Sequence, residues 1–258
     1  MKRHAAFTLT ELLILISVGT VLSALLVASL GDAKDKAQAA VCANNLREIG
    51  VAISMYANDH NDYYPPGYTG LSDWPLIIGP YLGKPHTTYA QTIDSSRAFL
   101  CPSGVQPRAH NNLPVRLMYS AHRILMPSSS EGYPLYKRSR AARASEVVLV
   151  ADGVQQSVYY AGEFAAAANF DHVGAAIQFY CPGGGCSPPF TGVIAGTTPD
   201  NVMTTNAIAG SNTDDTPNAG KIRFRHSGNT VANFLFCDGH VEGMALGQVK
   251  FRNLYFDP

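Results

Sequence analysis

The chain has 258 residues, of which 46% are hydrophobic and 15% are charged, and its formal net charge is zero. This length predicts one large domain or two small ones. Because there is no overall positive charge to hold a phosphate backbone, nucleic acid is not a favoured partner. The basic cluster between Lys137 and Arg143 is interpreted as a solvated surface.

The N-terminal segment carries a basic leader and then an apolar stretch, residues 7–30, whose single formal charge is Glu11. No charge occurs among the nineteen residues from 12 to 30, and a helix needs roughly 20 residues to span a bilayer. Lys2 and Arg3 precede this stretch, so the N-terminus is expected to stay cytoplasmic and the remaining mass to cross the membrane. A carboxylate near a bilayer core costs on the order of 2.5–3.5 kcal/mol, so Glu11 is expected to have a partner.

One long helix is predicted from about residue 7 to about residue 58, because the first proline is Pro65. Beyond residue 30 the helix is expected to be amphipathic, with Gly31 as a candidate kink. One apolar stripe has steps of four, three, four and three residues, and it comprises Cys42, Leu46, Ile49, Ile53 and Tyr56. The polar residues Asn44, Asn45, Arg47 and Glu48 are expected on the other side. Turn-rich residues 59–70 end the helix.

Short strands are predicted later in the chain, over residues 144–151, 175–180 and 231–237. Phe234 and Phe236 are expected on one face of the last of these, and Asp238-Gly239 indicates a type I′ hairpin turn. The stretch 181–220 has few apolar residues and is predicted to be a surface excursion. These elements predict an α+β fold, in which the N-terminal helix packs on a C-terminal antiparallel sheet with long loops.

The N-terminal segment resembles the class III signal of type IV prepilins and pseudopilins. In that signal a basic leader precedes F-T-L-x-E, which Phe7, Thr8, Leu9 and Glu11 match. The resemblance implies that a prepilin peptidase cuts between Ala6 and Phe7 and N-methylates Phe7, although family members usually carry Gly in place of Ala6. It also implies that Glu11 pairs with the terminal amine of a neighbouring subunit in a filament.

Landmarks further along the chain are similar to those of a pilin-like group from Planctomycetes, Verrucomicrobia and related bacteria, which is DUF1559-like and has a C-terminal His…Asp-Gly motif. Here that motif has eleven residues between His226 and Asp238, against nine in the group, so the loop at 227–230 is expected to be two residues longer. The matching landmarks are CANNLREIG, MYANDHNDYYPP, Cys101-Pro102-Ser103, SEVVLVADG and RHSGNTVANFLFCDGHVEG.

The two resemblances together imply a pilin-like organisation and a structural function. Residues 1–6 would be the leader, 7–30 a transmembrane and filament-core helix, 31–60 the amphipathic half of that helix, and 61–258 an extracytoplasmic globular domain. The implied function is that of a subunit of a type IV pilus or type II secretion-type filament. The implied location is the inner membrane, in a single pass. The implied partners are prepilin peptidase, other pilin or pseudopilin subunits, the assembly platform and membrane lipid.

The five cysteines fit this extracytoplasmic interpretation, because disulfides persist in oxidising compartments. Cys42 and Cys101 both lie in landmarks of the resemblance, and a disulfide between them is expected. Cys181 and Cys186 flank Pro-Gly-Gly-Gly and are a second candidate pair. Cys237 is then expected to be a buried free thiol.

Metal binding and catalysis have little support in the sequence. Asp200, Asp214 and Asp215 lie in a polar loop and are weak candidates for a structural calcium site; no other cofactor is expected. A structural role is favoured for His226, Asp238 and His240, with Asp238-Gly239 forming the turn and the histidines bonded to nearby backbone. No G-x-S-x-G, H-E-x-x-H or phosphate-binding glycine motif occurs, so enzymatic activity is not expected.

Three alternatives to a filament subunit stay open at this stage. The first is a minor pilin for DNA uptake that uses the basic cluster between Lys137 and Arg143. The second is a membrane-anchored extracytoplasmic binding protein or enzyme with no role in assembly, which predicts an uncut N-terminus. The third, a calcium-stabilised domain, is compatible with the main interpretation.

Overall fold

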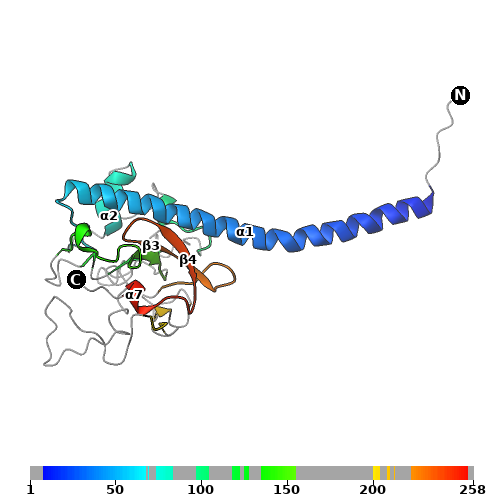
Figure 1. Cartoon of the computed structure of the whole chain (residues 1–258). Helices are drawn as coiled ribbons and strands as arrows, with labels where there is room; N and C mark the ends of the chain where they lie inside the picture. The colour runs from blue at the N-terminus through cyan, green and yellow to red at the C-terminus, as the bar shows by residue number, and fades with distance from the viewer. Residues whose placement is uncertain are drawn as a thin grey trace, which may run out of the picture.

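A long helix and a small antiparallel sheet dominate the computed structural model of this chain (Figure 1). The structure describes residues 8–67, 69, 74–83, 97–104, 118–122, 125–127, 135–154, 200–203, 208–209, 212 and 222–254. Of residues 27–29 and 251 it describes the backbone alone. The predicted α+β class is confirmed, with the helix first and the sheet strands later in the chain.

Helix α1 (Leu9–Asp59) is continuous over 51 residues, close to the predicted range. At 1.5 Å per residue it is roughly 75 Å long. It passes through Gly31 without a break and curves gently, so the candidate kink at that residue is not a sharp one (Figure 1). It ends where Asn61 and Asp62 adopt positive φ values of 54° and 68°, which a right-handed helix cannot continue.

The second half of α1 packs on the sheet through the predicted apolar stripe, and Cys42, Leu46, Ile49 and Ile53 are at most 1% exposed. Gly50 lies between these residues at the closest approach of the helix to strand β3 (Val231–Phe236). A Cβ atom at Gly50 would lie 2.9 Å from Cδ1 of Leu235, closer than carbon atoms normally pack. A side chain at this position would therefore force Leu235 to shift if the helix were to lie this near the sheet.

Asn45 corrects the prediction for the polar side of α1, because it is 8% exposed instead of facing solvent. Its position, three residues after Cys42 and four before Ile49, puts it at the border of the apolar stripe. Its Nδ2 donates to the carbonyl oxygen of Leu100 at 2.7 Å. The side-chain amide can be buried because the backbone next to it supplies a hydrogen-bond acceptor.

Four antiparallel strands form one sheet in chain order, namely β1 (Tyr119–Ala121), β2 (Val148–Asp152), β3 (Val231–Phe236) and β4 (Val241–Ala245). Strand β2 begins four residues later than predicted because residues 144–147 form turns that precede it. The strand predicted at 175–180 lies outside the described residues. The shorter helical segments are α2 (Trp74–Ile78), η1 (Gly79–Leu82), η2 (Arg97–Phe99), η4 (Arg138–Arg140) and α7 (Phe251–Leu254).

Both faces of the sheet are covered. Leu235 belongs to the core shared with α1, whereas Phe234 and Phe236 point to the opposite face, as their spacing predicts. On that opposite face lie Met203, Ile208, Ala209, Ile222, Phe224, Val249 and Leu254. The prediction of a surface excursion is therefore wrong for residues 203, 208 and 209, because the second face of an apolar sheet needs a cover and these side chains provide part of it.

The turn between β3 and β4 also differs from the prediction. The N–H of Gly239 donates to the carbonyl of Phe236 at 2.9 Å, and the N–H of Phe236 donates to the carbonyl of His240 at 2.9 Å. Gly239 has a φ of 93°, but Asp238 is not among the residues with positive φ, which a type I′ turn requires. This pattern is a type I turn followed by a glycine bulge.

The predicted loop at 227–230 is present between the paired residues His226 and Val231. Ser227, Gly228 and Asn229 have positive φ values of 48°, 69° and 66°. Three consecutive left-handed residues reverse the chain tightly and deliver His226 to the start of β3.

Candidate functional site

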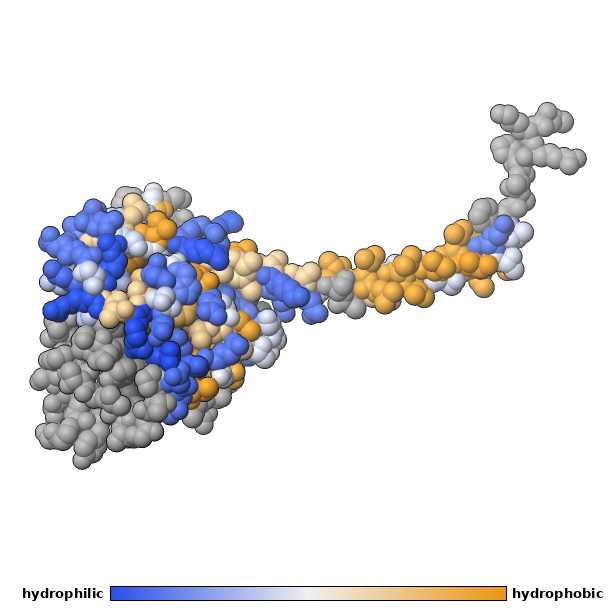
Figure 2. Space-filling view, viewed as in Figure 1, coloured by the Kyte–Doolittle hydropathy of each residue, from blue (hydrophilic) through white to orange (hydrophobic). Residues whose placement is uncertain are grey.

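The first half of α1, residues 9–30, projects from the globular body and exposes its apolar side chains (Figures 1 and 2). By length and composition it is able to cross a membrane. Leu9 is 81% exposed, and eleven more side chains are 52–67% exposed: Leu12, Leu13, Ile14, Leu15, Ile16, Val18, Val21, Leu22, Leu25, Leu26 and Leu30. A continuous apolar surface of this extent marks a membrane or protein interaction surface.

Glu11 and Thr8 close the N-terminal end of this helix as a capping box. Oε2 of Glu11 accepts from the Thr8 backbone N–H at 2.9 Å and from the Thr8 hydroxyl at 2.7 Å. The backbone N–H of Glu11 donates to Thr8 Oγ1 at 3.3 Å. The spacing Thr-x-x-Glu is a sequence pattern for such a cap, so the local partner of Glu11 was readable from the sequence but was not predicted. Ala6 and Phe7 lie outside the described residues.

The expected disulfide between Cys42 and Cys101 is present. It joins the second half of α1 to the residues that follow η2, across a sequence separation of 59. Both cysteines are fully buried. The expectation that Cys237 is a buried free thiol is also confirmed, and burial raises the pKa of that thiol to about 12, so it carries no charge at neutral pH.

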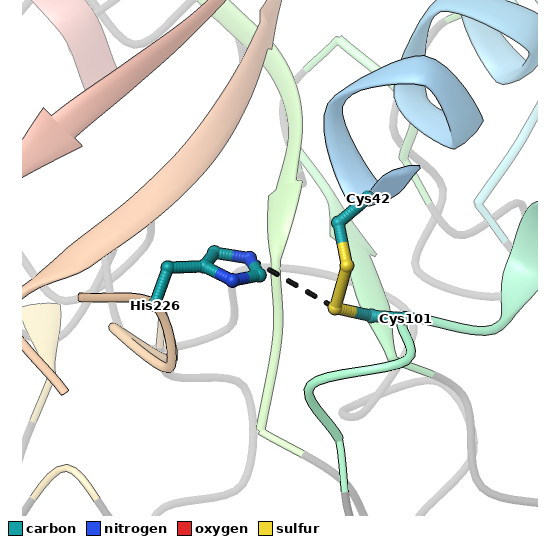
Figure 3. A group of neighbouring side chains, drawn as sticks. All are labelled: Cys42, Cys101 and His226. Carbon is teal, nitrogen blue, oxygen red and sulfur yellow. Dashed lines mark hydrogen bonds between the residues drawn. A yellow bond between two sulfur atoms is a disulfide. The ribbon is translucent and has the colours of Figure 1, made fainter. Parts of the chain in front are cut away.

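The side chain of His226 points toward Cys101 of the disulfide (Figure 3). Its Nε2 lies 3.8 Å from Sγ of Cys101 and 3.0 Å from Oδ2 of Asp152, the last residue of β2. The same carboxylate oxygen accepts from the backbone N–H of Asn233 at 2.7 Å. The side chains of His226 and Asp152 are both 0% exposed. The cluster of Cys42, Cys101, His226 and Asp152, called the buried cluster below, is thus closed to solvent.

The histidines of the C-terminal motif therefore have different surroundings from those expected. The side chain of His226 bonds to Asp152, not to backbone, because the tight loop after it directs it toward the core. His240 stays on the exposed turn, where its Nδ1 lies 2.6 Å from Oδ1 of Asp238. The structure separates His226 from the other two residues of the motif.

A comparison with protein-family models gives a match over residues 32–168, more than half of the chain, to the family described as protein of unknown function DUF1559. The chain belongs to the DUF1559 family. No curated protein and no solved structure matches it. The segment of this DUF1559 chain that matches begins after the apolar half of α1, contains Cys42, Cys101 and Asp152, and ends before His226.

The calcium candidates of the DUF1559 chain receive no support from the described residues. The carboxylate of Asp200 is bonded to Lys250 Nζ at 3.4 Å and to the guanidinium of Arg252. Its pKa is lowered, chiefly by the hydrogen bond from Lys250. Two cations at this carboxylate oppose the binding of a third. Asp214, Asp215, Cys181 and Cys186 lie outside the described residues.

Part of the basic cluster of the DUF1559 chain lies against the segment that follows α1, and two of its arginines are paired with carboxylates. The guanidinium of Arg138 lies 3.1 Å from the carboxylate of Asp62, and that of Arg143 lies 3.4 Å from the carboxylate of Glu146. The ammonium of Lys137 lies 5.1 Å from the centre of the Tyr63 ring. The contacts of Lys137 and Arg138 join the cluster to the segment after α1, whereas the Arg143–Glu146 pair is local to the cluster's own segment.

Proposed function

We propose that this DUF1559 chain is a pilin-like or pseudopilin-like structural subunit, which the first half of α1 anchors in the inner membrane and then joins to other subunits in a filament. The observation that carries the proposal is the apolar, solvent-exposed half of α1 that projects from the body (Figure 2). Its 22 residues correspond to about 33 Å of helix, enough for the roughly 30 Å hydrocarbon core of a bilayer. In a filament the same surface would pack against its copies.

The orientation in the proposal follows from charge and from the cysteines. Lys2 and Arg3 precede the apolar stretch and favour a cytoplasmic N-terminus. The globular body is then outside the cytoplasm, where an oxidising environment maintains disulfides. The bond between Cys42 and Cys101 supports this side of the membrane.

Glu11 has two roles in the proposal. Within one subunit it caps α1 through Thr8, and this cap uses only residues that remain after a cut before Phe7. Between subunits its carboxylate would pair with the new terminal amine of Phe7 in a neighbour. The cap supplies hydrogen bonds but no opposite charge, and an unpaired carboxylate in apolar surroundings is costly. The charge pair would therefore favour assembly over a free subunit in the membrane.

The first test is mass spectrometry of the mature N-terminus, on chain purified from a host with an active prepilin peptidase. The proposal expects a chain that begins with N-methylated Phe7. A mature chain that still begins at Met1 would overturn it and would favour a membrane-anchored protein with no assembly role.

The second test separates the two roles of Glu11. Glutamine at this position retains a capping box but carries no charge, whereas valine removes both. Glu11→Gln and Glu11→Val are both expected to insert in the membrane and to fail in filament incorporation. Glu48→Gln, on the exposed side of the same helix, is the matched control and is expected to assemble normally. Normal incorporation of Glu11→Gln would refute the charge pair and leave Glu11 with the capping role alone.

A further inference from the structure

The Cys42–Cys101 disulfide lies out of reach of external thiols in the folded chain. Both cysteines are 0% exposed, as are the side chains of His226 and Asp152 in the same buried cluster. A disulfide is exchanged with an oxidant or a reductant only by direct attack of a thiolate on a sulfur, through a mixed disulfide. The bond is therefore neither formed nor broken from outside while the buried cluster is closed.

Side chains from later in the chain cover the two cysteines. Sδ of Met118 accepts from the backbone N–H of Cys101 at 2.9 Å. The hydroxyl of Tyr119 donates to the carbonyl oxygen of Cys42 at 3.4 Å. Nε2 of His226 lies 3.8 Å from Sγ of Cys101 (Figure 3). Strand β1 and the segment before β3 thus enclose a bond whose two sulfurs come from residues that precede both of them.

The two segments that carry the cysteines also contact each other directly, without the sheet. Asn45 lies one helical turn after Cys42, and its Nδ2 donates to the carbonyl oxygen of Leu100 at 2.7 Å. Leu100 is the residue before Cys101. This contact is able to hold the two thiols together before the covering residues arrive.

We propose that the disulfide of a thiol–disulfide oxidoreductase oxidises Cys42 and Cys101 before His226 docks, and that the docked His226 then covers the bond. Oxidation and the final folding step thus have a fixed order. The oxidant acts on the open chain, and the folded chain keeps the bond from oxidants and reductants alike. The inference is independent of filament assembly.

The oxidation transfers two electrons from the chain to the oxidant. One cysteine thiolate attacks the disulfide of the oxidant, which forms a mixed disulfide and releases one thiolate of the oxidant. The thiolate of the other cysteine then attacks the chain sulfur of the mixed disulfide. This step forms the Cys42–Cys101 bond and releases the second thiolate of the oxidant. The two protons that the cysteines lose pass to the two released thiolates.

The first test measures how well the folded chain protects the bond. It uses the full chain in detergent micelles with Cys181→Ser and Cys186→Ser, which removes the two cysteines outside the described residues. Dithiothreitol is added to the oxidised chain, either native or unfolded in urea, and free thiols are alkylated and counted by mass spectrometry. The bond of the native chain is expected to be reduced at least about 100-fold more slowly, because the cover must open first. Reduction of the native chain at the rate of the unfolded chain would overturn the proposal.

The second test measures the order of oxidation and folding. The same chain is reduced in urea and refolded, and oxidised glutathione is added either at the start or after the fluorescence of Trp74 has recovered. Late addition is expected to form the bond at least about 100-fold more slowly than early addition. Equal rates for early and late addition would overturn the proposal. If the reduced chain does not recover the fluorescence of Trp74, the first test decides, because it starts from the oxidised chain.

Variants test the part that His226 plays in the cover. His226→Ala is compared with His122→Ala, which removes another fully buried histidine, one whose Nε2 bonds to the carbonyl of Leu254. Urea denaturation measures the stability of each variant, and each rate of native-state reduction is corrected for the loss. After correction, His226→Ala is expected to be reduced about 10-fold faster than the parent chain and His122→Ala at the parent rate. An unchanged corrected rate for His226→Ala would refute its covering role, and the first two tests do not depend on this variant folding.

Discussion

Reduction of the Cys42–Cys101 disulfide is expected to lower the free energy of unfolding by about 4 kcal/mol. The bond closes a loop with a sequence separation of 59 residues, which runs through the second half of α1, α2, η1 and η2. In the chain-entropy model, closing a loop of this length lowers the conformational entropy of the unfolded state by about 14 cal/mol/K.

Denaturation by urea, followed by the fluorescence of Trp74, measures this difference. Trp74 is the only tryptophan of the chain and is fully buried. Its ring lies 5.8 Å from that of Phe99, two residues before Cys101, so its emission reports on the body that the disulfide fastens. With a slope of about 3 kcal/mol per M urea, the midpoint should fall by about 1.3 M on reduction.

The control is Cys237→Ala, a substitution of the buried thiol that forms no disulfide. It is expected to shift the oxidised and reduced midpoints together and to leave their difference unchanged. Equal midpoints for the oxidised and reduced chain at equal slope would refute the argument, because the loop would then be constrained by packing alone in both states.

Two further predictions concern helix packing and a buried histidine. Gly50→Ala is expected to lower the free energy of unfolding by about 1 kcal/mol, since overpacking against Leu235 costs more than the gain in helix propensity. Gly31→Ala has nothing within 4 Å of its added Cβ, so it gains helix propensity without a clash and should not lower the urea midpoint. A lower midpoint for Gly31→Ala than for Gly50→Ala would contradict the close approach at Gly50. Burial lowers the pKa of His122 to about 4, against about 6.5 when unfolded, so the unfolded chain binds an extra proton between these values. The free energy of unfolding should therefore fall by about 3 kcal/mol as the pH drops from 7 to 4. His122→Gln should flatten this pH dependence, whereas the control His60→Gln, at an exposed position, should keep it. The same pH dependence in all three chains would refute the role of His122.

Local patterns accounted for α1 and for part of the site. The apolar stretch, the stripe from Cys42 to Ile53 and the absence of proline before residue 65 predicted a helix that ends close to where it does. The same residues predicted which half of it would be buried in the body. These predictions succeed because helix formation and amphipathic packing depend on neighbours within a few residues.

Predictions failed where a distant segment decided the environment. Asn45 looks like a surface residue by its polarity, yet the carbonyl of Leu100 supplies an acceptor and makes burial acceptable. Met203 lies in a stretch of turn residues, yet it covers the second face of the sheet. The prediction of the turn type at Asp238-Gly239 failed for a different reason. An Asp-Gly pair is compatible with more than one turn type, and the pairing of β3 with β4 selects between them.

The sequence by itself determined the apolar half of α1 and the carboxylate of Glu11 at its start. The pairing of Cys42 with Cys101 was an expectation, and the structure confirms it. Only the tertiary structure decided that Nε2 of His226 lies 3.8 Å from Sγ of Cys101 and 3.0 Å from Oδ2 of Asp152, in a place closed to solvent. The physical reason is sequence distance: His226 and Cys101 lie 125 residues apart, and no local pattern specifies how strands β2 and β3 bring their ends to one point. Packing on both faces of the sheet fixes that point.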